Sequence, residues 1–267
     1  MSAARWRAMV LLAVFGAGCG PAEPGDDNAS VDLTLDSADS IELEGALLAP
    51  FMEAAAGASG PLALAEAARR GRELALTTYT PSSCVTAAAQ DNTLTLTLAG
   101  CAGPLALRDV TGTLSATFTR GALRPAVTVR ATGLRLNGAV LDTLSVMELD
   151  LTRLLVPLMR VTSTVTGVGA RGVRIERQGV HAYRYERATQ CVTTDGQWRD
   201  GLASATITNL RRCAGGCPEP GGAIRLERSG VGEVVTLSYP GGSTGLWRRT
   251  VGGVQRGSGT FRIACQN

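Results

Sequence analysis

The 267-residue chain has no lysine, a single histidine at His181 and only 4% aromatic residues. Because histidine is the usual general acid or base near neutral pH, its near absence excludes much common enzyme chemistry. All 26 basic residues are arginine, whose codons are GC-rich, so the missing lysines indicate a bacterial gene of high GC content. A hydrophobic content of 45% and a net charge of +3 exclude a disordered chain. The 33 glycines follow no Gly-X-Y period, which excludes collagen.

Catalytic motifs are missing as well. The sequence contains no Gly-x-Ser-x-Gly elbow, phosphate loop or His-Glu-x-x-His motif. Alternation along its segment places His181 on one strand face with Tyr183 and Tyr185. We expect His181 to be a surface strand residue packed beside these aromatics rather than a general base. The sequence therefore predicts no catalytic residue and no cofactor.

The first residues have the pattern of an export signal. Arg5 and Arg7 precede an apolar stretch, Ala8–Gly18, which is too short to span a bilayer. Small residues lead directly into Cys19, and this ending resembles the lipobox of bacterial lipoproteins. Gly16 departs from that pattern, which usually has a larger apolar residue there.

The resemblance implies that residues 1–18 are a lipoprotein signal peptide and that Cys19 carries the lipid. Acyl chains contribute about 0.8 kcal/mol per buried methylene, so two or three of them hold a protein durably on a membrane. Gly20, rather than aspartate, follows the cysteine. By resemblance to lipoprotein sorting, this implies an outer-membrane location, with the membrane as a partner through the lipid anchor.

Acidic residues dominate the next segment. From Glu23 to Glu44 there are eight acidic residues and no basic one, and two prolines open the run. Such a segment is polar and self-repelling, so residues 19–40 are predicted to be an acidic flexible tether. Its aspartates lack the glycine and terminal glutamate of an EF-hand, so no metal site is predicted there.

Residues 41–76 are predicted to form a helical segment. Leu43, Leu47, Leu48 and Phe51 recur at helical spacing, and a second helix is expected to begin at Pro61. The segment lacks the basic face of a membrane-binding amphipathic helix. We therefore expect two short helices packed on a sheet.

Residues 77–267 have the composition of an antiparallel β body. Of 28 threonines, 27 lie after Leu76, and residues 93–98 read TLTLTL, the alternation of a half-buried strand. Short strand-like runs recur between turn signals such as Asp91-Asn92, Asn137-Gly138, Asp195-Gly196 and Pro240-Gly241. We predict a mainly β fold, an antiparallel meander, sandwich or open barrel, with a possible sub-boundary near residues 188–192.

The β body carries 21 arginines against 12 acids. A nucleic-acid surface is one use for such charge, but the arginines are scattered and have no interleaved aromatics. We predict no nucleic-acid partner.

Six cysteines remain after Cys19, and an even number in an exported chain predicts three disulfides. Cys84 and Cys101 flank the turn at Asp91-Asn92 almost symmetrically, so they are expected to pair. For the other four, we prefer Cys213 with Cys217 and Cys191 with Cys265. The alternative joins Cys191 to Cys213 and Cys217 to Cys265. These four lack paired Cys-x-x-Cys spacing, so zinc is not predicted.

Trp198 and Trp247 each adjoin an arginine near a turn. Aromatic platforms beside polar groups bind sugars or cationic partners, which makes these two tryptophans candidate ligand-binding residues. Core or turn packing is the simpler interpretation, and the sequence names neither a protein nor a carbohydrate partner.

The segment from Cys191 to Cys265, with Arg212-Cys213-Ala-Gly-Gly-Cys217-Pro218 and Gly221-Gly222, resembles the tail of lipoproteins from high-GC Gram-negative bacteria of the myxobacterial type. Residues from Cys84 to about Asp150 are similar to the same group, for which no activity is established. The sequence thus favours a lipid-anchored, non-enzymatic binding or structural module at the cell envelope. The alternatives are a carrier that holds an apolar ligand between the sheet and the helical segment and, third, a hydrolase of unknown type.

The lipid-anchor hypothesis predicts that the exported chain incorporates labelled palmitate and that the Cys19→Ser variant does not, because the variant lacks the acceptor sulfur. Metabolic labelling followed by immunoprecipitation measures this. Label retained by Cys19→Ser would contradict the anchor.

Overall fold

The computed structural model describes residues 29–56, 63–103, 107–120, 125–150, 152, 156–186, 188–189, 191–213, 216–263 and 265. The predicted signal peptide, the lipid site at Cys19 and the first part of the predicted tether lie outside these residues. None of the described helices is both long enough and apolar enough to cross a membrane.

Among the described residues, two helices precede thirteen strands along the chain. The helices are α1 (Ala29–Ala56) and α2 (Ala63–Thr78), and a 3-10 turn, η1 (Ser82–Cys84), follows them. The strands are β1 (Val85–Gln90), β2 (Thr93–Cys101), β3 (Val110–Arg120), β4 (Pro125–Leu136), β5 (Ala139–Asp150), β6 (Leu158–Val168), β7 (Arg174–Glu186), β8 (Cys191–Asp200), β9 (Ala203–Cys213), β10 (Gly222–Arg228), β11 (Glu233–Tyr239), β12 (Thr244–Val251) and β13 (Val254–Arg262).

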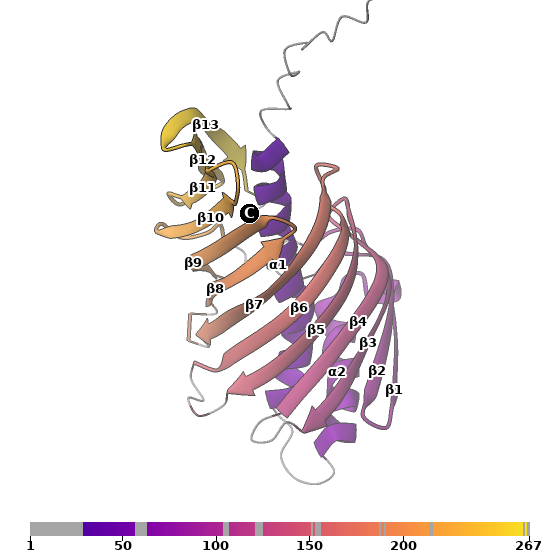
Figure 1. The fold of residues 1–267 in the computed structure, drawn as a ribbon. Helices are drawn as coiled ribbons and strands as arrows, with labels where there is room; N and C mark the ends of the chain where they lie inside the picture. The colour runs from indigo at the N-terminus through magenta and orange to yellow at the C-terminus, as the bar shows by residue number, and fades with distance from the viewer. Residues whose placement is uncertain are drawn as a thin grey trace, which may run out of the picture.

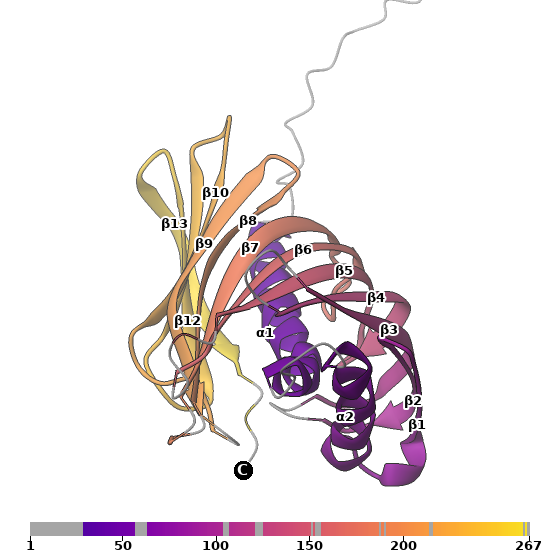
Figure 2. The same cartoon turned by 90° about the horizontal axis from the view of Figure 1, so that it is seen from below.

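All thirteen strands form one antiparallel sheet in sequence order, from β1 to β13. The predicted mainly β meander is therefore confirmed. Since β7 pairs directly with β8, the sheet continues across residues 188–192, where a sub-boundary was considered. The sheet is strongly curved, and both helices lie on its concave side (Figures 1 and 2).

Alternation along the strands assigns one face to the core. In β2, Leu94, Leu96 and Leu98 are buried while Thr95 and Thr97 are exposed. The same period recurs in β5 and β6, which places most buried side chains on the concave face. The outward face of β6 carries threonines, whereas that of β5 exposes Val140, Leu144 and Val146 between acidic residues. A single core cluster results, and it joins the concave face to α1 and α2.

Helix α1 occupies the centre of the concavity. It packs against β4, β5, β7 and β11, while α2 packs against β1, β2 and β3. Nineteen of the 28 residues of α1 are buried, so protein surrounds this helix on most sides. Residues 29–40, which the sequence analysis assigned to a flexible tether, are therefore helical and packed. The segment's apolar residues, among them Val31, Leu33 and Leu35, are buried and outweigh its acidity.

Asp195-Gly196 was expected to be a turn, but it lies inside β8. A Cβ atom on Gly196 would stand 2.6 Å from a ring carbon of His181 and 2.7 Å from the carbonyl oxygen of Val180. This glycine is needed for close approach of β8 to β7 rather than for a turn.

Three disulfides staple the sheet. Cys84 pairs with Cys101, as predicted. Cys191 pairs with Cys213 and Cys217 with Cys265, so the preferred arrangement of these four was wrong and the alternative is present. The physical reason is register: Cys191 and Cys213 are direct partners across β8 and β9.

The pairing predicts which thiol each single variant releases. In Cys265→Ser, the free thiol should be Cys217, whereas the rejected arrangement would free Cys191. Alkylation without reductant followed by fragmentation mass spectrometry locates the label, with Cys101→Ser as a control that should free Cys84. Because the bond between Cys217 and Cys265 spans 48 residues, its loss should cost about 4 kcal/mol of unfolding free energy.

Candidate functional site

An open polar hollow of about 380 Å³ lies beside the N-terminal half of α1. Helix α1 forms one wall, the β6–β7 turn at residues 169–171 forms another, and β9, β11 and the end of β13 supply the third. Its charged lining side chains are three acids and three arginines: Asp36, Asp39, Glu42, Arg171, Arg212 and Arg262. The charges of these six sum to zero, and we call this site the polar hollow.

The acids line one face of α1, at positions i, i+3 and i+6. Asp36 is the innermost, and its side chain is fully buried. It accepts hydrogen bonds from the backbone N–H groups of Arg171 and Val173 and from Arg171 Nη1, at 3.0 to 3.3 Å. A Cβ atom on Gly169 would come within 2.3 Å of the Asp36 carboxylate, so only glycine fits there. Asp36 thus fixes the turn that walls the hollow.

Asp39 lies further out and keeps about half of its side chain exposed, at 48%. Its Oδ2 atom is 2.7 Å from Arg171 Nη1, so Asp36 and Asp39 share one guanidinium. Burial raises the pKa of Asp39, although the neighbouring Arg171 opposes this shift.

Glu42 forms the second ion pair of the hollow, with its Oε2 atom 2.9 Å from Arg212 Nη2. Burial raises the pKa of Glu42 to about 7, with Arg212 lowering it and the negative charge of Asp39 raising it further. Burial outweighs the arginine here, so this carboxyl group titrates near neutral pH.

An aromatic pair closes the hollow on the side of the last strands. Tyr239 and Phe261 meet edge to face with ring centroids 5.8 Å apart. Burial and the carboxylates of Glu42 and Asp39 raise the pKa of Tyr239 well above 10, so its hydroxyl stays protonated. The hollow therefore combines paired charges, a phenol and an aromatic surface.

A second polar cluster is enclosed beneath α1. Glu44 Oε2 is 2.7 Å from Arg177 Nη2, and both side chains are almost wholly buried. Ser145 and Ser163 donate hydrogen bonds to the same carboxylate at 2.5 and 3.2 Å. Burial alone would raise the pKa of Glu44, but Arg177 and the serine hydrogen bond of Ser145 lower it overall. This cluster binds α1 to the sheet.

His181 is fully buried beside this cluster, so the expected surface position was wrong. Curvature of the sheet around α1 turns its strand face inward. Of the two expected aromatic neighbours, Tyr183 lies beside it with ring centroids 6.4 Å apart, and the second aromatic contact is with Trp198 at 6.1 Å. Burial and the nearby Arg177 lower the pKa of His181 to about 4. It lies outside the polar hollow and makes no hydrogen bond within the described residues.

The structure does not bring the two candidate tryptophans together, nor into the polar hollow. Trp198 is 2% exposed and contributes to the core. It borders a broad open depression of about 460 Å³ across β7 to β10, but its ring offers almost no free surface there. Trp247 is partly buried and lies over Gly257 and Gly259. Trp198 is thus a core residue, whereas Trp247 packs on two glycines of the neighbouring strand.

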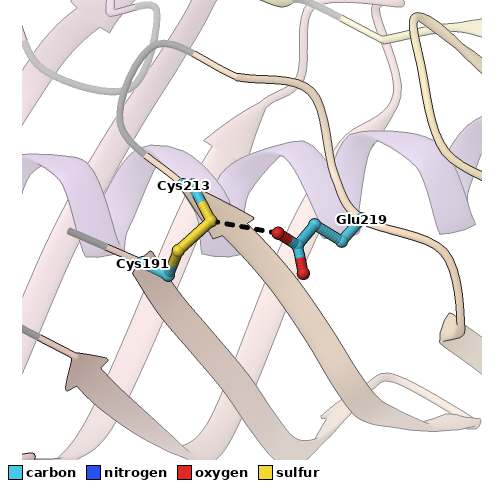
Figure 3. Close-up of side chains that lie close together, drawn as sticks. All are labelled: Cys191, Cys213 and Glu219. Atoms are coloured by element: carbon cyan, nitrogen blue, oxygen red, sulfur yellow. Dashed lines mark hydrogen bonds between the residues drawn. A yellow bond between two sulfur atoms is a disulfide. The ribbon is translucent and has the colours of Figure 1, made fainter. Parts of the chain in front are cut away.

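Cys191, Cys213 and Glu219 come within 4.8 Å of one another and are the one such group of possible metal ligands in the part of the chain described (Figure 3). Cys213 Sγ lies 3.2 Å from Glu219 Oε1. Both sulfur atoms belong to the disulfide, so neither is the thiolate that zinc requires.

Sequence reasoning missed the residues that define the polar hollow. Asp36 and Asp39 were assigned to a tether, and Glu42 was given no role. Their spacing of three residues was the available signal, since it aligns three carboxylates on one helix face. The arginines come from distant strands and carried no local signal.

Comparison with known proteins gives no match to a protein-family model, a curated protein or a solved structure.

The raised pKa of Glu42 predicts a pH-dependent effect of Glu42→Gln. In the folded chain Glu42 keeps its proton up to about pH 7, whereas in the unfolded chain a carboxyl group with the ordinary pKa of 4.5 loses its proton at a lower pH. Between these values the wild type loses stability relative to the variant as pH rises, by up to about 1.4 kcal/mol per pH unit. The unfolding free energy, variant minus wild type, should therefore increase from acid to alkaline pH.

Urea titrations on either side of this interval measure the difference. Glu73→Gln, on the exposed face of α2, is the matched control. A difference for Glu42→Gln that stays constant with pH would contradict the assignment.

Proposed function

We propose that the protein is an exported lipoprotein, anchored through Cys19 at the outer membrane, whose β body is a non-enzymatic binding module. The observation that carries the binding role is the polar hollow. Its volume of about 380 Å³ falls within the range of about 300–1,000 Å³ that is typical of small-molecule sites. It is open to solvent and lined by polar groups from elements far apart in the sequence.

The anchor places this hollow close to the membrane. Nine residues lie between Cys19 and Ala29, the first residue of α1, and the acids of the hollow lie on the following turns of that helix. Fully extended, this linker reaches about 35 Å, which limits how far α1 stands from the lipid surface. The three disulfides support export, because such bonds persist in oxidising compartments.

The chemistry of the hollow favours binding over catalysis. His181 lies elsewhere, beneath α1. Asp36 and Asp39 are held by Arg171, and Glu42 is held by Arg212. Groups engaged in ion pairs orient a ligand well, but they are poor nucleophiles.

The apolar-carrier alternative gains little from the geometry. Two pockets beside α1 have apolar linings, but they measure only about 50 and 20 Å³. Both fall far below the size of about 300 Å³ at which ligand pockets begin. Side chains of α1 fill the space in which the carrier hypothesis placed its ligand.

Substitution of Ala170 by tryptophan tests the binding role. Ala170 lines the hollow from the exposed β6–β7 turn, so a large side chain there obstructs the space without disturbing the core. In equilibrium dialysis against a small-molecule extract of the cell envelope, the wild type should retain a compound on its side of the membrane that Ala170→Trp does not.

Mass spectrometry of the released compound gives the readout. An unchanged mass, with about one molecule per chain, is the expected result. Equal retention by Ala170→Trp would remove the hollow as the binding site, and chemical conversion of the compound would favour an enzyme.

A further inference from the structure

We propose that the polar hollow binds a small, neutral, polyhydroxylated ligand of the size of a mono- or disaccharide. The inference rests on the proposed function, because it names the ligand class of the same site. It follows from how the charges of the hollow are paired, from which polar atoms remain open, and from the aromatic wall.

Five of the six charged side chains in the hollow are already engaged in ion pairs with one another. Asp36 and Asp39 hold Arg171 between them, and Glu42 holds Arg212, whose side chain is only 9% exposed. A ligand with full charges of its own would compete with these ion pairs, and breaking a buried pair is strongly destabilising. A neutral ligand binds without disturbing them.

Two carboxylates that line the hollow keep one oxygen outside their ion pairs. Asp39 and Glu42 meet their arginines through Oδ2 and Oε2, and within the described residues neither Asp39 Oδ1 nor Glu42 Oε1 accepts a hydrogen bond. Hydrogen bonds to charged acceptors are stronger than those between neutral groups, and Glu42 is such an acceptor above its pKa of about 7. Two open carboxylate oxygens on adjacent turns of α1 form a pair of sites for hydroxyl donors.

Donors lie on the opposite side of the same space. Arg262 lines the hollow from the end of β13 with an exposed side chain, and Tyr239 supplies a hydroxyl that stays protonated. A sugar hydroxyl donates one hydrogen bond and accepts others, so adjacent hydroxyls bridge a carboxylate and a guanidinium at once. This mixture of donors and acceptors suits a polyol better than a cation or an anion, which uses only one kind.

The aromatic wall adds an apolar surface for the C–H face of a sugar ring. Phe261 is half-buried, and it is held in place by Tyr239 at 5.8 Å and by Gly245, where a Cβ atom would come within 2.1 Å of the ring. Fixed aromatic side chains present contact area at little entropic cost. A volume of about 380 Å³ leaves room for one or two sugar rings.

Saturation-transfer difference NMR with the full chain tests the ligand class. The exported protein is kept in a polyoxyethylene detergent, which has no sugar headgroup, and is titrated with glucose and N-acetylglucosamine. Glutamine and glycylglycine serve as zwitterionic probes of similar size. We expect saturable signals in the millimolar range from at least one sugar and none from the zwitterions.

Variants then locate the binding. Asp39→Ala removes an open acceptor from a half-exposed side chain and should weaken sugar binding at least tenfold, and Ala170→Trp should abolish it. Glu73→Ala, on the exposed face of α2, should leave it unchanged. Circular dichroism and the disulfide map show that each variant is folded.

The outcomes separate this inference from the proposed function. Zwitterion binding without sugar binding would overturn the ligand class, as would sugar binding that survives both Asp39→Ala and Ala170→Trp. Suppose that no probe binds, but that the wild type still retains an envelope compound and Ala170→Trp does not. The proposal of a polyhydroxylated ligand is then wrong, and the proposed binding function is still supported. If the wild type retains no envelope compound either, both the polyhydroxylated ligand and the binding function are contradicted.

Discussion

The ion pair between Glu44 and Arg177 determines where helix α1 lies, and the rest of the structure follows from that placement. Both charges are taken out of water, which costs several kcal/mol unless each finds partners. The two serines of β5 and β6 and the guanidinium from β7 provide them in a single geometry. One register of α1 against the sheet satisfies this set, because a shift by one residue would turn the carboxylate away. The pair therefore specifies position more than it adds stability.

With α1 fixed at Glu44, the helix residues within about two turns before it acquire their surroundings. Glu42 meets Arg212 on β9, and Asp36 meets the β6–β7 turn. At the start of the helix, Ser30 donates a hydrogen bond to Glu233 on β11 at 2.8 Å. The polar hollow thus results from the position of the buried helix α1, which leaves Asp39, the most exposed of its three acids in the hollow, facing solvent.

The strands and their order were accessible from sequence because they depend on local alternation. The alternation TLTLTL in β2 and the residues Asn137-Gly138 at a turn specify a strand and a turn locally. A meander then requires only that neighbouring strands pair. The boundary of α1 was not accessible, since acidity in residues 29–40 was taken as evidence against packing. Asp36 is buried only because backbone amides 135 residues away are aimed at it. His181 was misplaced for the same reason: strand alternation gives a face, but only the curvature of the whole sheet decides which face is covered.

The sequential meander has a consequence for the way the chain assembles. Each hairpin forms from residues close in sequence, so the sheet is able to grow strand by strand as the chain is synthesised. Helix α1 is the first described element to emerge, yet its contact with Glu233 spans 203 residues. The apolar side of α1 therefore stays uncovered until most of the strands have formed. An early element whose partners form late keeps apolar surface exposed during folding, when such surface is most prone to non-native contacts.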